Sequence, residues 1–321
     1  MPRLSAAPAL GAPLARDRCR RSDTRFKRRA PSGRTAALAA GCVAVLLAAA
    51  SPASAQSLAG TASQQLRVDV LSKGSSSLLG IRKAKAAVPT RGMHESSRRS
   101  VQAVLDDLSI YRKLPDIRCE ADPRVLDYFL DHPDVAVGIW RTLGVSNVQL
   151  VQTGPGRYQA DDGAGSRGDV TVVYRDQVQQ VIFCDGVFLN PMNKKPIQAR
   201  AVIHFRHRGE RSRDGRKFSR HDATMFVSLP SNGVEAVARA ISPVSNKLAD
   251  RNFQEVSLFV RMMSVAMTEQ PDWVRGLADR MTDVPLDRRQ QLSTLAVTVH
   301  NDAVAGGRSR VAGGSGGAVV R

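Results

Sequence analysis

The feature that most constrains the fold is a change in the spacing of apolar residues near Val148. From there to Leu229 apolar and polar residues alternate with the period of two that is typical of strands, and the flanking sequences follow helical spacing instead. Most of the intervening segments are short and contain Gly or Asn, as in the turns of an antiparallel sheet. The pattern predicts strands at 148–153, 157–161, 169–175, 179–189, 198–208 and 217–229.

Two of these strands separate their side chains clearly into two faces, because neighbouring residues of a strand point to opposite sides. In the first, one face carries Ala201, Ile203, Phe205 and His207. In the second, one face carries Ala223, Met225, Val227 and Leu229. The alternation predicts half-buried strands with one apolar face.

Helices are predicted before and after these strands in the sequence. One runs from Pro123 to about Leu143, with Asp122 as its N-cap and a break at Pro133. After the sheet, a long tract extends to Met267, and Pro243 should kink it. Shorter helices are expected over 273–281 and 287–299.

A helical segment, a run of antiparallel strands and a long closing helix occur in that order between Ile110 and Met267. In this order, in the stretch from Asp131-His132-Pro133-Asp134 to Ile139-Trp140, and in the tract from Val244, the chain resembles START-like domains of the polyketide-cyclase and START (SRPBCC) superfamily. The resemblance implies an α+β helix-grip fold, in which a curved antiparallel sheet wraps around a long kinked C-terminal helix. It also implies a cavity between sheet and helix that receives a lipid or another apolar molecule.

The candidate ligand-binding residues are bulky apolar side chains that could face inward from the sheet and the helices. A packed core without a cavity would use the same residue types, so that alternative stays open. The candidates are Trp140, Phe183, Ile203, Phe205, Met225, Val227, Phe259 and Met263.

No catalytic residue, metal site or cofactor is predicted. His204 and His207 should point to opposite faces of their strand, which argues against a shared metal ion. An enzyme that uses the same pocket remains an alternative, a cyclase or hydrolase in which His207, His221 or Asp222 would transfer protons.

The N-terminal sequence predicts export. Residues 36–50 are apolar, follow a basic run and precede Ala53-Ser54-Ala55, a pattern typical of a signal peptide cleaved after residue 55. Fifteen apolar residues are fewer than the roughly 20 that a membrane-spanning helix needs, although retention as an anchor is an alternative. We therefore expect a periplasmic or secreted protein.

Charge indicates which partners to expect. The formal charge of +18 falls to about +10 without residues 1–55, which hold 10 Lys or Arg and 2 Asp. An exported basic chain suits anionic membranes or envelope polymers rather than nucleic acid. The segment 206–220 concentrates seven basic residues beside Phe218, so Arg211, Arg213, Arg216 and Lys217 are predicted to bind membrane, with a solvated loop as the alternative.

Cys119 and Cys184 are the two cysteines that remain after residue 55. In an oxidising compartment they are candidates for a disulfide, and two separate buried cysteines are the alternative. The predicted organisation is a signal peptide over 1–55, a flexible basic linker over 56–100, one domain over 101–300 and a disordered Gly/Ser-rich tail over 301–321.

Overall fold

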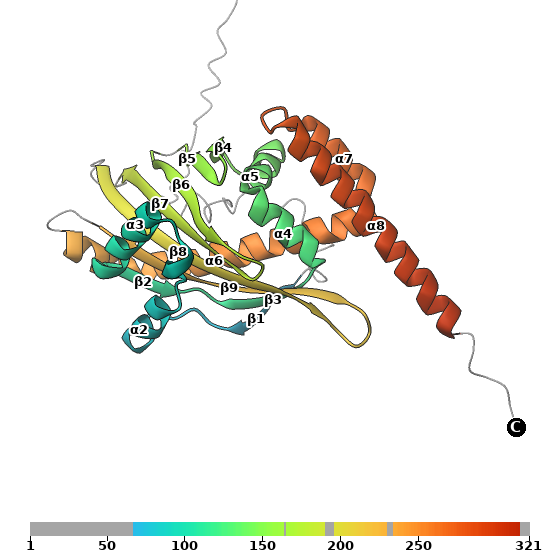
Figure 1. Cartoon of the computed structure of the whole chain (residues 1–321). Helices are drawn as coiled ribbons and strands as arrows, with labels where there is room; N and C mark the ends of the chain where they lie inside the picture. Colours follow the sequence, from blue (N-terminus) through green and yellow to red (C-terminus); the bar gives the residue numbers. More distant parts are fainter. Residues whose placement is uncertain (1–66, 164, 190–195, 230–233, 315–321) are drawn as a thin grey trace, which may run out of the picture. The chain divides into compact units, whose positions relative to one another are not determined.

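The structure is a computed structural model that describes residues 67–163, 165–189, 196–229 and 234–314 (Figure 1). Within these residues the strands form one antiparallel sheet in the order β1-β3-β9-β8-β7-β6-β5-β4, and β2 also pairs with β9. With the helices described below, the fold belongs to the α+β class. The strands are β1 Asp69–Ser72, β2 Ile110–Lys113, β3 Asp116–Glu120, β4 Gln149–Gly154, β5 Arg157–Asp161, β6 Arg167–Arg175, β7 Gln179–Leu189, β8 Pro196–Arg211 and β9 Lys217–Ser228.

The six strands predicted from the alternating pattern are confirmed as β4 to β9, with bounds that match or differ by at most three residues at each end. Their antiparallel pairing places Ile203 opposite Met225 and Phe205 opposite Ala223, so the predicted apolar rows share one face. Gly215 has a φ of 80° at the β8–β9 turn, where a residue with a Cβ would be strained.

Strands β1, β2 and β3 were not predicted. Each has only four or five residues and lies outside the continuous run of alternating segments in which the equally short β5 was recognised. Strand β9 is long enough to pair with two of them, with β2 beside residues 224–227 and β3 beside residues 218–221.

The apolar rows face three helices, α4 Pro123–Asp131, α5 Pro133–Thr142 and α6 Val234–Glu269, and we call this the inner face of the sheet. The predicted start of α4 is confirmed, because the Asp122 carboxylate accepts a hydrogen bond from the backbone N–H of Arg124. Pro133 ends one helix and begins the next, as expected. Pro243 lies within α6, and the kink there stays a prediction.

The opposite, outer face of the sheet is covered by residues that were predicted to be a flexible linker. That prediction is wrong for the part of 56–100 that the structure describes, which contains α2 Leu78–Ala86, a 3₁₀ turn Thr90–Gly92 and the start of α3 Glu95–Asp106. Val88 and Met93 from this stretch are buried in one cluster with Val101, Val104 and Leu105 of α3 and with Val181, Val202 and Phe226 of the sheet. The outer face is therefore a second apolar core.

Two further helices follow α6, namely α7 Pro271–Arg280 and α8 Leu286–Gly314. The disordered tail predicted from residue 301 is wrong up to residue 314, because α8 continues from its packed first half into the Gly-rich sequence. Buried Arg288 pairs with buried Asp134 of α5 and accepts a hydrogen bond at its carbonyl from Tyr128 Oη, at 2.7 Å. These contacts attach α8 to α4 and α5.

The disulfide predicted between Cys119 and Cys184 is wrong, because the two are separate buried cysteines. They lie on β3 and β7, with β9 and β8 between them in the sheet. Three strand spacings of about 4.8 Å exceed the roughly 7 Å that a disulfide can bridge between Cα atoms. Burial raises the pKa of Cys119 to about 11.

The export signal predicted over residues 1–55 lies outside the described residues. Among the helices that the structure does describe, none combines the length and apolar composition needed to cross a membrane.

Candidate functional site

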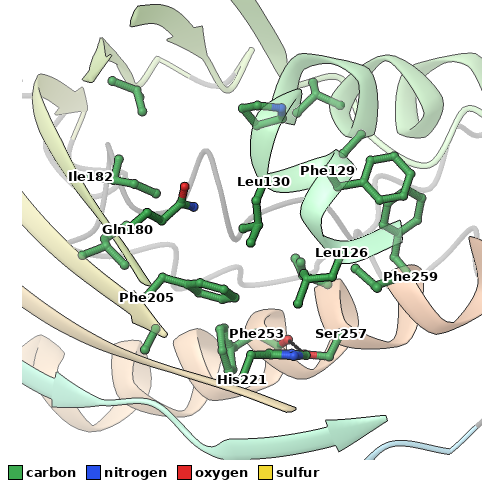
Figure 2. A pocket seen from close by; sticks show the side chains of 18 of the residues that line it. Leu126, Phe129, Leu130, Gln180, Ile182, Phe205, His221, Phe253, Ser257 and Phe259 are labelled. Carbon is green, nitrogen blue, oxygen red and sulfur yellow. Dashed lines mark hydrogen bonds between the residues drawn. The ribbon is translucent and has the colours of Figure 1, made fainter. Parts of the chain in front are cut away.

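A cavity of about 130 Å³ lies on the inner face, between the sheet and helices α4, α5 and α6 (Figure 2). Its walls are mostly aliphatic and aromatic, and among the described residues no Asp, Glu, Lys or Arg lines it. Leu130, Val172, Phe205 and Val256 are only half-buried, so the cavity reaches towards the surface. The lining residues are Leu114, Leu126, Phe129, Leu130, Pro133, Ala136, Val137, Trp140, Tyr158, Val170, Val172, Gln180, Ile182, Ile203, Phe205, His221, Ala223, Phe253, Val256, Ser257, Phe259 and Val260.

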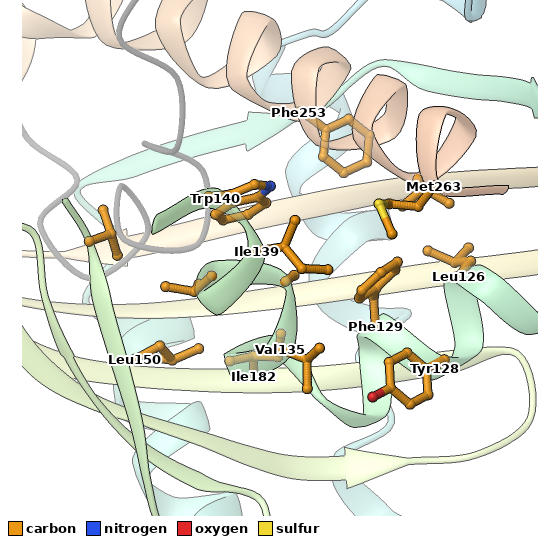
Figure 3. Packing of buried hydrophobic residues seen from close by; sticks show 14 of the residues in the cluster. Leu126, Tyr128, Phe129, Val135, Ile139, Trp140, Leu150, Ile182, Phe253 and Met263 are labelled. Carbon is orange, nitrogen blue, oxygen red and sulfur yellow. The ribbon is translucent and has the colours of Figure 1, made fainter. Parts of the chain in front are cut away.

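The helical wall of the cavity is held by aromatic contacts between three elements. The ring of Phe259 on α6 lies 5.0 Å from that of Phe129 on α4 and 5.3 Å from that of Trp140 on α5, measured between centroids. Tilted and edge-on pairs at this spacing are the favoured arrangements of aromatic rings. Phe129 and Trp140 belong to the buried core drawn in Figure 3, and Phe259 packs against it.

The predicted ligand-binding residues divide into three groups. Trp140, Ile203, Phe205 and Phe259 line the cavity. Met225, Val227 and Met263 belong to the same core, and the cavity lining does not include them. Phe183 points to the outer face and packs with the second core, because it is one residue out of step with the inward-facing Ile182.

His221 and Ser257 form a buried polar pair in the cavity wall, with His221 Nε2 at 2.7 Å from Ser257 Oγ. The Ser257 hydroxyl donates to the carbonyl of Phe253, one turn earlier on α6, also at 2.7 Å. Because a hydroxyl has one hydrogen, we assign the proton between the two side chains to His221 Nε2. Burial and then the nearby His207 lower the pKa of His221 to about 4, so the ring is neutral near pH 7.

Gln180 is a further buried polar side chain in the cavity wall, with 4% of its surface exposed. It projects from β7 into the space beside Leu126, Leu130 and Phe205 (Figure 2). Its Oε1 atom is buried and has no hydrogen-bond partner among the described residues. A buried unpaired amide oxygen in an apolar wall is costly unless a bound molecule or an ordered water satisfies it.

The proton-transfer candidates do not converge on the cavity. Asp222 faces away from the inner row and pairs with Arg206. His207 Nδ1 lies 3.4 Å from Asp127 Oδ1, outside the cavity lining, and burial lowers the His207 pKa. Of the three, only His221 lines the cavity.

The β8–β9 hairpin carries the predicted membrane-binding residues. Arg211 and Arg213 are exposed near its tip. Arg216 pairs with Asp214 at 2.6 Å, and Lys217 pairs with Asp122, also at 2.6 Å. The apolar residue noted beside these charges, Phe218, is buried.

Phe218 is 6% exposed and lies beneath the guanidinium of Arg118, which is 3.5 Å from the ring centroid. Cation–π contact of this kind keeps an aromatic ring covered. Any contribution of this hairpin to membrane binding therefore rests on charge.

Sequence reasoning missed Gln180 and Ser257. Gln180 occupies an inward position in the row that continues with Ile182 and Cys184, where an apolar residue is expected. Ser257 occupies the apolar stripe of α6 between Phe253 and Val260. In both places the available signal was a polar residue in a row of apolar ones.

Comparison of the sequence with models of known protein families found no match, and comparison with characterised proteins found none either. Within the described residues, no group of three His, Cys, Asp or Glu side chains is arranged to hold a metal ion.

Proposed function

We propose that this chain is an exported protein that binds a hydrophobic small molecule or lipid in the inner-face cavity. The observation that carries the proposal is the apolar space between the sheet and the three helices, walled by Phe129, Phe205 and Phe259. In other proteins, dry apolar cavities of roughly 150 Å³ bind small apolar molecules. A longer acyl chain would extend past half-buried Leu130 and Val172.

The resemblance to START-like domains supports the same function. In that superfamily a long helix closes a cavity against a curved antiparallel sheet, and here α6 lies against the inner face (Figure 1). We therefore propose a helix-grip arrangement with α6 as the gripped helix. The absence of charge from the described lining favours an apolar ligand over an ionic one.

Binding of a lipophilic fluorescent probe tests this function, and saturable binding is expected. Ala223→Phe should abolish probe binding with little change in the thermal midpoint, because Ala223 lines the cavity. Val227→Trp is the matched control, because Val227 is buried in the same sheet face and is not part of the lining. Overpacking there should lower stability by roughly 1–3 kcal/mol.

If no probe binds saturably, or if both variants lower the midpoint equally, the packed-core alternative is correct. That alternative is an envelope protein that binds anionic polymer or membrane through its basic surface.

A second candidate function is hydrolysis or cyclisation in the same cavity, which the contact between His221 and Ser257 brings into consideration. Activation of a serine requires the imidazole to accept the hydroxyl proton, and here the ring donates to Ser257. The assignment of the proton to His221 Nε2 therefore favours ligand binding over catalysis. Ester turnover that disappears in Ser257→Ala would reverse this preference.

A further inference from the structure

We infer that the ligand carries an uncharged hydrogen-bond donor, a hydroxyl or N–H group, that binds Gln180 Oε1. The inference rests on the proposed function, because it specifies what the same cavity recognises. The Gln180 side chain is almost fully buried and is turned into the cavity from β7 (Figure 2).

The unpaired atom determines the kind of group that fits. Gln180 Oε1 is an acceptor without a partner among the described residues, so the ligand must supply a hydrogen. His221 Nδ1 is likewise buried without a partner there, and the assignment of the proton to Nε2 makes Nδ1 an acceptor too. The two buried atoms of the described wall that lack a partner, Gln180 Oε1 and His221 Nδ1, therefore both favour a donor.

The rest of the wall limits the charge of the ligand. A carboxylate or ammonium group would enter without a counter-charge, because the described lining contains no ionic side chain. A neutral imidazole at His221 supplies none. The ligand class is thus an apolar molecule with a neutral donor, such as a long-chain or polycyclic alcohol, rather than a fatty carboxylate.

Two isomeric probes test the inference. 1-Nonanol and methyl octyl ether have the same atoms and similar apolar chains, and only the alcohol can donate. Wild-type protein should bind the alcohol about tenfold more tightly, because the ether would leave the buried acceptor Gln180 Oε1 without a hydrogen-bond donor. In competition with the fluorescent probe, octanoate should bind more weakly than either isomer.

Gln180→Leu should remove the preference for the alcohol and leave ether binding unchanged or tighter. Ile182→Val, on the same inward row, is the control and should keep the preference. Equal affinity of the two isomers for wild-type protein would overturn the inference without any variant. If neither isomer displaces the probe because no probe binds, the proposed function itself fails, which is a distinguishable result.

Discussion

Lys217 donates a hydrogen bond from Nζ to Asp122 Oδ2 over 2.6 Å, and so joins β9 to the first turn of α4. The same carboxylate accepts from the side chain and the backbone N–H of Arg124. Burial alone would raise the pKa of Asp122, but these hydrogen bonds outweigh it and lower the pKa to about 2. One buried carboxylate therefore helps to position the helix that walls the cavity.

We expect Asp122→Ala to lower the free energy of unfolding by about 2 kcal/mol near pH 7, from the lost cap and the lost ionic contacts. Because the folded pKa is depressed, this stabilisation is present above about pH 4 and is lost as the pH falls towards 2. Urea unfolding at several pH values measures it. The variant should lose that acid-dependent step, whereas Asp169→Ala on an exposed strand position should retain it.

The second prediction concerns buried His221, whose folded pKa of about 4 is below the ordinary histidine value near 6.5. The unfolded state takes up the proton first, so stability is full above pH 6.5 and falls as the pH decreases towards 4. The loss from this residue is on the order of 3 kcal/mol.

His221→Gln should therefore flatten the dependence of the unfolding free energy on pH between 6.5 and 4. His204 contributes in the same direction, because burial lowers its pKa to about 4 as well, so part of the slope should remain. His94→Gln is the control, because His94 is exposed. An unchanged slope in His221→Gln would show that this imidazole is protonated as easily when folded as when unfolded.

Helix α3 should be part of the cooperative fold. Leu105 is 3% exposed in the outer core, and Leu105→Ala should cost about 2–5 kcal/mol. Leu79 on α2 is 95% exposed, so Leu79→Ala should change stability by less than roughly 0.5 kcal/mol. Chemical denaturation of both variants measures the contrast, and equal small effects would show that α3 does not pack stably on the sheet.

Salt-sensitive binding to anionic vesicles should depend on the exposed arginines of the β8–β9 hairpin. Arg211→Gln with Arg213→Gln should weaken it without lowering the thermal midpoint, because both side chains are exposed. Lys217→Gln should lower the midpoint instead, because it removes the contact with Asp122. Vesicle co-sedimentation at two salt concentrations distinguishes these effects, and unchanged binding would identify a solvated loop.

Intact-mass analysis of the protein from its native host should find Gln56 as the first residue. The basic run, the apolar segment at 36–50 and Ala53-Ser54-Ala55 together predict that cleavage site. A retained N-terminus would support the anchor alternative.

Strands β4 to β9 could be predicted because they follow one another as one run of alternating segments, and the pattern also placed Ile203 and Phe205 on the correct face. The outer core was missed although its signal was present. Val202 and Phe226 are apolar residues on the face that was expected to be polar. They indicated that another element covers that face.

An apolar cavity between the sheet and the helices could be predicted, but the exact set of residues that line it could not. Met225 and Ile203 are cross-strand neighbours on the same face, yet Ile203 lines the cavity and Met225 is absent from the lining. The difference depends on the distance between the sheet and the helices, which a sequence pattern does not contain.

Burial of the sheet on both faces has a consequence for folding fidelity. In β7 the neighbours Val181 and Ile182 are both buried, and so are Val202 and Ile203 in β8. A slip of one residue would exchange the two faces, and here it would replace one apolar row by another. The hydrophobic pattern therefore discriminates weakly between the native alignment and its nearest competitor. Gln180 strengthens the discrimination, because the misaligned strand would place its amide in the apolar outer core. The residue proposed to recognise the ligand therefore also helps to exclude a misfolded sheet.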